Sequence, residues 1–189
     1  ENLINLKNFF KKYIQEGGIL VHSPIDIDPI IKGTQGFDVA GIIELQDVLS
    51  NLDLELETIN SNDISHSEIK ENLISVGGPI PNSITRSLFN KYETIYTFQD
   101  HEIIGKKIRK KFSPILIGNK VKMDLGIITR MKNPYNLEKD CIIVSGCFGW
   151  GTQACLRVLA REWNLKYLNR HMYFQAICSC DVDQSNIGA

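Results

Sequence analysis

The residues best suited to do chemistry lie in a glycine-rich segment of the C-terminal third of the chain. Residues 141–145 (Cys-Ile-Ile-Val-Ser) predict a buried strand, and residues 152–162 predict a helix. Between strand and helix lie three glycines and a threonine: Gly146, Gly149, Gly151 and Thr152. Glycines let backbone N–H groups approach a ligand closely, and a helix N-terminus adds unpaired donors and a partial positive charge. The segment therefore predicts a cradle for a phosphate or carboxylate group.

The spacing of these glycines is neither the dinucleotide-binding pattern nor the P-loop, since no Gly-Lys-Ser/Thr follows. Cys147 and Trp150 lie inside the segment and are predicted to line the same ligand site. The alternative is a helix start built from small residues, with nothing bound. Three glycines within residues 146–151 exceed what one turn needs, which favours binding.

A second segment of this kind follows the predicted strand at residues 73–76 (Leu-Ile-Ser-Val). It supplies four candidate ligand-binding residues: Gly77, Gly78, Asn82 and Ser83. In an open α/β sheet, ligands bind beyond the C-terminal ends of the strands, near the point where the strand order reverses. Two glycine-rich loops at that edge could face one crevice. Alternatively, Asn82 or Ser83 could cap the following helix.

Charge is distributed unevenly along the chain, although the formal sum is −1. Residues 106–132 hold nine basic residues and one acid, whereas residues 38–72 hold nine acids and one lysine. The sum argues against a globally basic nucleic-acid binder. Two oppositely charged solvated faces are the interpretation that this distribution favours. The alternative is that Arg130 or Lys132, at the end of a predicted strand, reaches an anionic small-molecule ligand, and Arg130 is the predicted charge partner.

Four residues are candidates for catalysis: Asp38, Glu44, Asp124 and Cys147. Cys147 would lie before a helix N-terminus, which favours a thiolate, but no histidine is near it in sequence. His22 or His101 could approach it in three dimensions. The three carboxylates could serve a glycosyl-transfer or glycohydrolase reaction on a nucleotide, although Asp38 could instead cap a helix. On balance, the sequence favours binding over catalysis.

The cysteines and histidines do not predict a metal site. The five cysteines contain no Cys-x-x-Cys pair, and the four histidines are scattered. Reduced, buried thiols are typical of a cytoplasmic protein, and no apolar run is long enough to span a membrane. Because the chain lacks an initiator Met, we expect it to be a fragment of a longer multidomain protein.

Helices and strands are expected to alternate over most of the 189 residues. Predicted helices cover residues 3–14, 38–52, the turns after 83, and 152–162, and predicted strands cover 19–21, 54–59, 73–76, 141–145 and 171–181. Only short β-like runs occur between residues 93 and 132. This order predicts a single α/β, Rossmann-like domain over residues 1–189, with a mostly parallel sheet, helices on both faces, and a small antiparallel insertion at about 93–132.

The two glycine loops together resemble the Rossmann-like nucleotide-sensing domains related to the lysine decarboxylase-like phosphoribohydrolases. In that superfamily one loop carries a Gly-Gly turn, and a later strand runs into Pro-Gly-Gly-x-Gly-Thr. Gly77-Gly78 would match the first loop, and residues 145–152 would match the second. The enzymes place a catalytic Glu shortly after the Gly-Thr, where this chain has Gln153. The resemblance therefore implies a ligand-sensing member, as part of a regulatory or defence protein.

The combined expectation is a sensor domain that binds a nucleotide, dinucleotide or nucleotide-derived ligand. Its other expected partners are further domains of the same chain and a second copy in a homo-oligomer. Two alternatives stay open. One is a nucleotide N-glycosidase or deoxyribosyltransferase-like enzyme, and the other is a protein interaction module without a small ligand.

Overall fold

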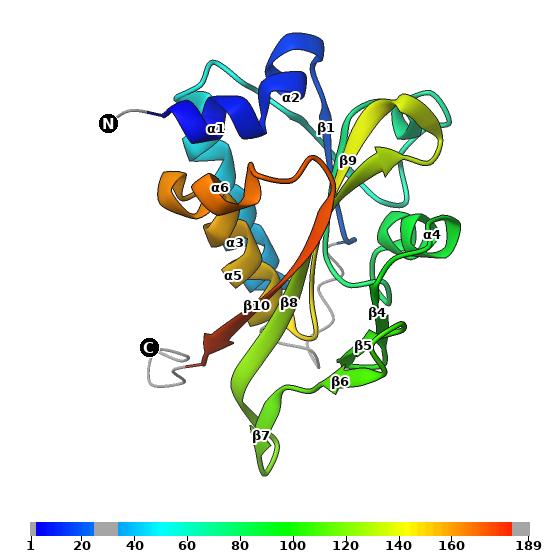
Figure 1. Ribbon diagram of the computed structural model, residues 1–189, viewed down its shortest axis with the longest axis vertical. Coiled ribbons are helices and arrows are strands. Elements are labelled where there is room, and N and C mark those ends of the chain that lie inside the picture. Colours follow the sequence, from blue (N-terminus) through cyan, green and yellow to red (C-terminus); the bar gives the residue numbers. More distant parts are fainter. Residues whose placement is uncertain (1–2, 25–33, 183–189) are drawn as a thin grey trace.

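The apolar run at residues 19–21 forms β1 (Ile19–His22), an interior strand next to the edge of a seven-stranded mixed sheet. The computed structural model describes residues 3–24 and 34–182, and places six strands in the order β10-β8-β9-β3-β1-β2 (Figure 1). Strands β2 (Glu57–Asn60), β3 (Leu73–Val76) and β9 (Asn136–Gly146) continue the parallel arrangement around β1. The chain forms β2 on one side of β1 and β3 on the other, so the strand order reverses between β1 and β3.

Antiparallel strands complete the far side of this sheet. Strand β8 (Lys120–Asn133) pairs with β9, with β10 (Phe174–Asp181) and with β7 (Ile115–Ile117). A separate three-stranded antiparallel sheet contains β4 (Tyr96–Gln99), β5 (Glu102–Gly105) and β6 (Lys110–Phe112). The α/β class and the small antiparallel sheet are confirmed. The predicted insertion extended too far, because β7 and residues 120–132 of β8 belong to the main sheet.

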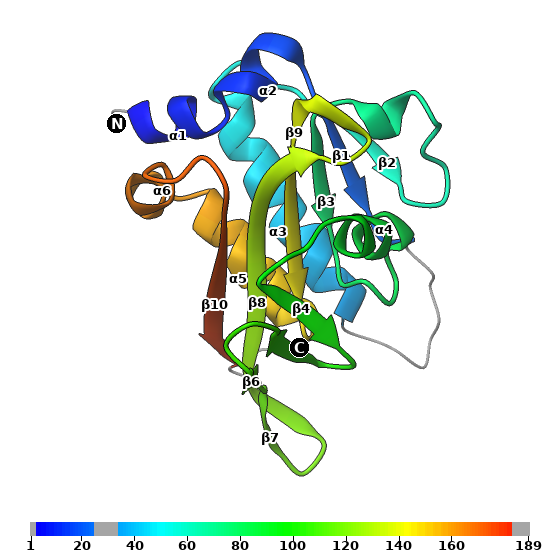
Figure 2. The ribbon, with the colours of Figure 1, turned by 45° about the vertical axis from the view of Figure 1, so that its right-hand side comes forward.

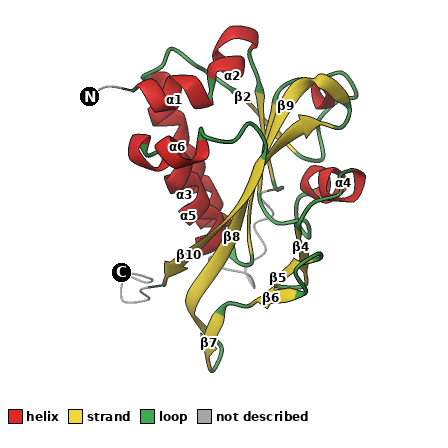
Figure 3. Ribbon diagram, in the orientation of Figure 1, coloured by secondary structure: helices red, strands yellow, loops and turns green. Residues whose placement is uncertain are grey.

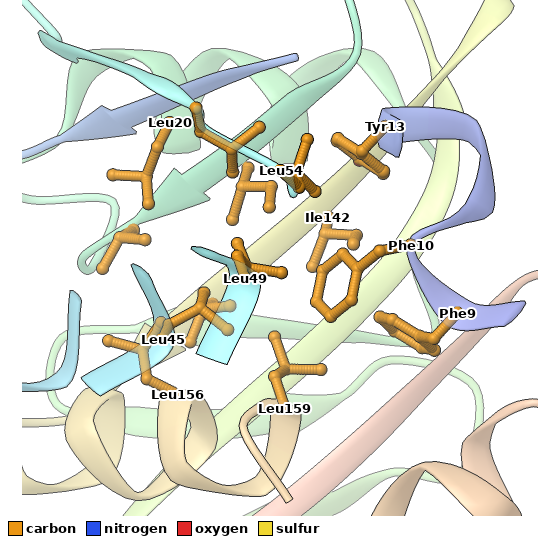
Figure 4. Close-up of a cluster of buried hydrophobic side chains, with 14 of the residues drawn as sticks. Phe9, Phe10, Tyr13, Leu20, Leu45, Leu49, Leu54, Ile142, Leu156 and Leu159 are labelled. Carbon is orange, nitrogen blue, oxygen red and sulfur yellow. The ribbon is translucent and has the colours of Figure 1, made fainter. Parts of the chain in front are cut away.

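Helices cover both faces of the sheet, as Figures 1 and 3 show. One face carries α1 (Ile4–Phe9), α2 (Lys11–Glu16), α3 (Thr34–Ser50), α5 (Gly149–Leu159) and α6 (Glu162–Leu168). The other carries α4 (Ser83–Lys91) and the short 3₁₀ turn η1 (Glu68–Lys70). Alternation along the strands explains the two layers, because Leu20 faces the first set of helices and Val21 the second (Figure 4 shows the first cluster).

Several element boundaries differ from those expected. The helix predicted over residues 3–14 breaks at Phe10 into α1 and α2. Helix α3 begins at Thr34, so Asp38 lies in its second turn and does not cap it. The predicted strand at residues 54–59 begins only at Glu57, and α6 was not expected at all.

The basic block divides between the surface and the sheet. Seven of its nine cations are exposed: Lys106, Lys107, Arg109, Lys110, Lys111, Lys120 and Lys122. Five of them lie in the β5–β6 turn and on β6, and the other two lie at the start of β8. The β7–β8 hairpin projects from the body in both orientations of Figures 1 and 2. Most of this block is therefore a solvated face. In the described part of the chain, no helix has the length and apolarity required to cross a bilayer.

Candidate functional site

A cavity of about 240 Å³ lies beyond the C-terminal ends of β1, β3 and β9. Its walls come from four places: Ser23 and Asp38, residues 78–81, residues 146–149 with Thr152, and the β4–β5 turn with Phe98, Asp100 and His101. The two glycine loops therefore line one crevice. They approach closely, since a Cβ on Gly78 would lie 3.4 Å from the carbonyl oxygen of Gly146. The cavity occupies the β1/β3 switch point, where open α/β sheets bind their ligands.

The β9–α5 loop is held in shape by Asp124, a fully buried residue of β8. Its carboxylate accepts hydrogen bonds from three backbone N–H groups, of Leu125 (2.7 Å), Phe148 (3.2 Å) and Gly151 (2.6 Å). Burial raises the pKa of Asp124, while these hydrogen bonds oppose the shift. The Asp124 carboxylate thus occupies part of the N-terminus of α5, where the sequence predicted the phosphate or carboxylate group of a ligand.

Some N–H groups near this helix N-terminus are engaged, and others have no partner among the described residues. The N–H group of Gly146 donates to the hydroxyl of Thr152 (3.0 Å), and that of Cys147 donates to the carbonyl of Leu125 (2.8 Å), so both are engaged. The first N–H groups of a helix have no partner inside the helix. Within residues 3–24 and 34–182, we find none for the N–H groups of Gly149 and Trp150. Gly149 lines the cavity, so its N–H group is the donor best placed for a ligand anion.

Asp38 is a half-buried carboxylic acid of α3 that lines the cavity. Burial raises its pKa from 3.8 to about 7, opposed by a hydrogen bond with Thr152, and the charge of Asp124 adds to the increase. Its Oδ1 atom is buried without a hydrogen-bond partner among the described residues, as is Oγ of Ser23. Such shifts and unsatisfied atoms are typical of functional sites.

Gly77 adopts φ of +110°, a backbone conformation that L side chains rarely take. A Cβ at this position would also lie under 3.0 Å from Oγ of Ser23 and 3.6 Å from Oδ2 of Asp38. The glycine therefore allows β3 to turn beside these two polar side chains.

The small antiparallel sheet supplies the aromatic wall of the cavity. The ring of His101 stacks on Phe148, with centroids 4.6 Å apart and an interplanar angle of 9°. Nδ1 of His101 lies 2.9 Å from the carbonyl oxygen of Cys147. Because a carbonyl oxygen only accepts, Nδ1 of His101 is the donor of this hydrogen bond. Phe98 lines the same cavity.

Several predicted ligand-binding residues do not line the cavity and instead make contacts within the fold. Asn82 is fully buried and caps α4, because its Oδ1 accepts from the N–H groups of Ile84 and Thr85, both at 3.0 Å. Ser83 donates to the carbonyl of Ser61 (3.2 Å). Trp150 packs on Phe37, with ring centroids 4.8 Å apart.

Arg130 is not brought to the cavity. It pairs with Ile142 in the β8–β9 ladder, whereas Gly126 pairs with Gly146 at the cavity end. Its guanidinium lies 3.5 Å from Asp140 and over the ring of Phe9 at 4.8 Å. The role of ligand charge partner therefore does not fit its place in the fold.

The four catalytic candidates are also separated. Glu44 makes an ion pair with Arg157 (2.8 Å) between α3 and α5, away from the cavity. Cys147 lines the cavity, but burial and the charges of Asp124 and Glu102 raise the pKa of its thiol to about 12. This environment opposes the thiolate that the sequence predicted. Because Asp124 is bound to the loop, Asp38 is the candidate whose carboxyl faces the cavity.

Sequence reasoning did not select Ser23 or His101 as ligand-binding residues. Ser23 directly follows β1, so the rule that selected the two glycine loops also applied to it. His101 reaches the cavity only because the β4–β5 turn lies beside it, and no local sequence pattern predicts that position.

Gly151 is required where α5 crosses β8. A Cβ there would lie well under 3.0 Å from the carbonyl group of Leu125, which is backbone and cannot swing aside. We expect Gly151→Ala to lower the free energy of unfolding by about 2 kcal/mol, measured by urea denaturation. Gly36→Ala is the control, because a Cβ there meets nothing within 4 Å in α3. Equal stabilities of the two variants would contradict the close approach.

Comparison with known proteins adds no family to this description. No protein-family model matches the chain, and no curated protein matches it either. Across residues 3–24 and 34–182, no three His, Cys, Asp or Glu side chains are grouped so that they could hold a metal ion.

Proposed function

We propose that this domain binds a nucleotide or nucleotide-derived ligand in the cavity between the two glycine loops. The observation that carries the proposal is the position of the cavity at the β1/β3 switch point, with buried unsatisfied polar atoms in its wall. The resemblance of the two loops to Rossmann-like nucleotide-sensing domains supports the same ligand class.

The chemistry of the walls suits the parts of a nucleotide. Phe148, His101 and Phe98 offer flat apolar surfaces on which a heterocyclic base would stack. The free N–H group of Gly149 would receive a phosphate oxygen. Among the described residues that line the cavity, none is Lys or Arg. A ligand with one phosphate therefore fits better than a triphosphate.

The test is a thermal-unfolding screen with AMP, GMP, CMP, UMP and NAD. A ligand at a hundredfold excess over its dissociation constant stabilises the fold by about 2.7 kcal/mol. We expect at least one member of the panel to raise the melting temperature. A shift for none of the five would contradict the proposal.

A variant that closes the cavity makes the screen specific. Gly78 lines the cavity, has no positive φ, and has room for a Cβ, so Gly78→Leu is expected to fold and to abolish the shift. Gly36→Leu is the matched control, because Gly36 lies in α3 outside the cavity with open space around it. It should retain the shift.

The second candidate is a nucleotide N-glycosidase or deoxyribosyltransferase-like enzyme, which Asp38 favours. A cavity carboxyl with a pKa of about 7 is suited to general acid–base work near neutral pH. The same panel is incubated with the protein, and the released base is measured by chromatography. Release that disappears in Asp38→Asn would support the enzyme, whereas binding without release would support the sensor.

A further inference from the structure

Two buried oxygen atoms in the cavity wall have no hydrogen-bond partner in the described part of the chain. They are Oδ1 of Asp38 and Oγ of Ser23, and the whole Ser23 residue is only 8% exposed. Buried polar atoms in folded proteins are nearly always hydrogen-bonded, so an unsatisfied pair calls for an explanation. Both residues line the cavity, which makes a ligand the natural partner.

The Ser23 hydroxyl and the Asp38 carboxyl come from different elements but lie close together. Ser23 follows β1 and Asp38 lies on α3, and Oγ of Ser23 and Oδ2 of Asp38 are both near the position that a Gly77 Cβ would take. Gly77 has no side chain, so no Cβ separates the hydroxyl from the carboxyl, and both residues line the cavity.

Thr152 holds the Asp38 carboxyl beside the β9–α5 loop. The Thr152 hydroxyl accepts from the N–H group of Gly146 (3.0 Å), so its own proton is available for its hydrogen bond with the Asp38 carboxyl. The Asp38 carboxyl is thereby held against the β9–α5 loop, while its Oδ1 atom has no partner among the described residues. A hydrogen-bond donor of the ligand would satisfy this atom.

We infer that Asp38 and Ser23 form a subsite for the adjacent 2′- and 3′-hydroxyl groups of a ribose. This inference rests on the proposed function and names the sugar it selects. A carboxylate oxygen accepts from one hydroxyl group, and a serine hydroxyl both donates and accepts with its neighbour. A 2′-deoxyribose has one hydroxyl fewer and would leave one of the two buried oxygens unsatisfied. The pair therefore discriminates ribonucleotides from 2′-deoxyribonucleotides.

The experiment compares dissociation constants for matched ribo- and 2′-deoxyribonucleoside monophosphates of all four bases, measured by titration calorimetry. We expect at least about tenfold tighter binding of the ribo form that binds best, which is the effect of one lost hydrogen bond to a charged group. In Asp38→Leu the ratio should fall toward one. Ser23→Ala is the milder variant and should also reduce the ratio. It provides the test if Asp38→Leu does not fold.

Asp63→Asn is the control. Asp63 is exposed in the turn after β2 and does not line the cavity, so this variant should keep the full ratio. Equal binding of ribo and deoxy forms by the unmodified protein would overturn the ribose subsite while leaving nucleotide binding intact. Binding of neither form would overturn the proposed function, and the subsite with it.

Discussion

Asp124→Ala is expected to lower the free energy of unfolding by about 4 kcal/mol. The substitution removes a buried carboxylate and leaves the N–H groups of Leu125, Phe148 and Gly151 without their acceptor. Hydrogen bonds to charged groups contribute about 1.5–3 kcal/mol each, and relief of the buried charge offsets part of the loss. Urea denaturation followed by tryptophan fluorescence measures the change.

The control for this variant is Asp63→Ala, because Asp63 is exposed in the turn after β2. It should change the stability by less than about 0.5 kcal/mol. Asp124→Asn, which retains one acceptor oxygen, should lie between the two. A loss below about 1 kcal/mol in Asp124→Ala would show that the β9–α5 loop keeps its shape without the carboxylate.

The free energy of unfolding is expected to fall as the pH rises from about 4 to about 8, because of Asp38. In the folded protein its pKa is about 7, against 3.8 for an unburied aspartate, so between these values the folded state binds more protons than the unfolded chain. The contribution of Asp38 is complete below about pH 4 and is lost as the pH passes through 7. Three pKa units correspond to about 4 kcal/mol.

Asp38→Asn isolates this effect, because asparagine has nearly the same shape and does not titrate. We expect the variant to be several kcal/mol more stable than the unmodified protein at pH 8, and to differ little at pH 4. Burial also raises the pKa of Asp124, and taking the difference between the two proteins at each pH cancels its contribution. A difference that does not change with pH would refute the buried, proton-binding state of Asp38. A site residue whose replacement stabilises the fold is typical of strain kept for function.

The sequence could predict those parts of the fold and of the site that depend on a local pattern of residues. Residues 73–76 and 141–145 are apolar runs that enter glycine turns, and the rule for open α/β sheets places both turns at one edge. The position of Arg130 depends instead on the pairing of β8 with β9, since the register sets it four residues from the cavity end. The sequence marked Asp124 only as the acid within a basic block and as a candidate for catalysis. Its bonds to the β9–α5 loop require β8 to lie beside β9, which no local pattern reveals.

The carboxylate of Asp124 also bears on the entropy of ligand binding. Many phosphate loops are ordered only when an anion arrives, and the ordering weakens the observed affinity. Here the folded chain carries its own anion against the first turn of α5, so the loop has its shape before any ligand is present. A ligand would then meet a rigid, preformed wall, and its affinity would not be reduced by the ordering of that loop.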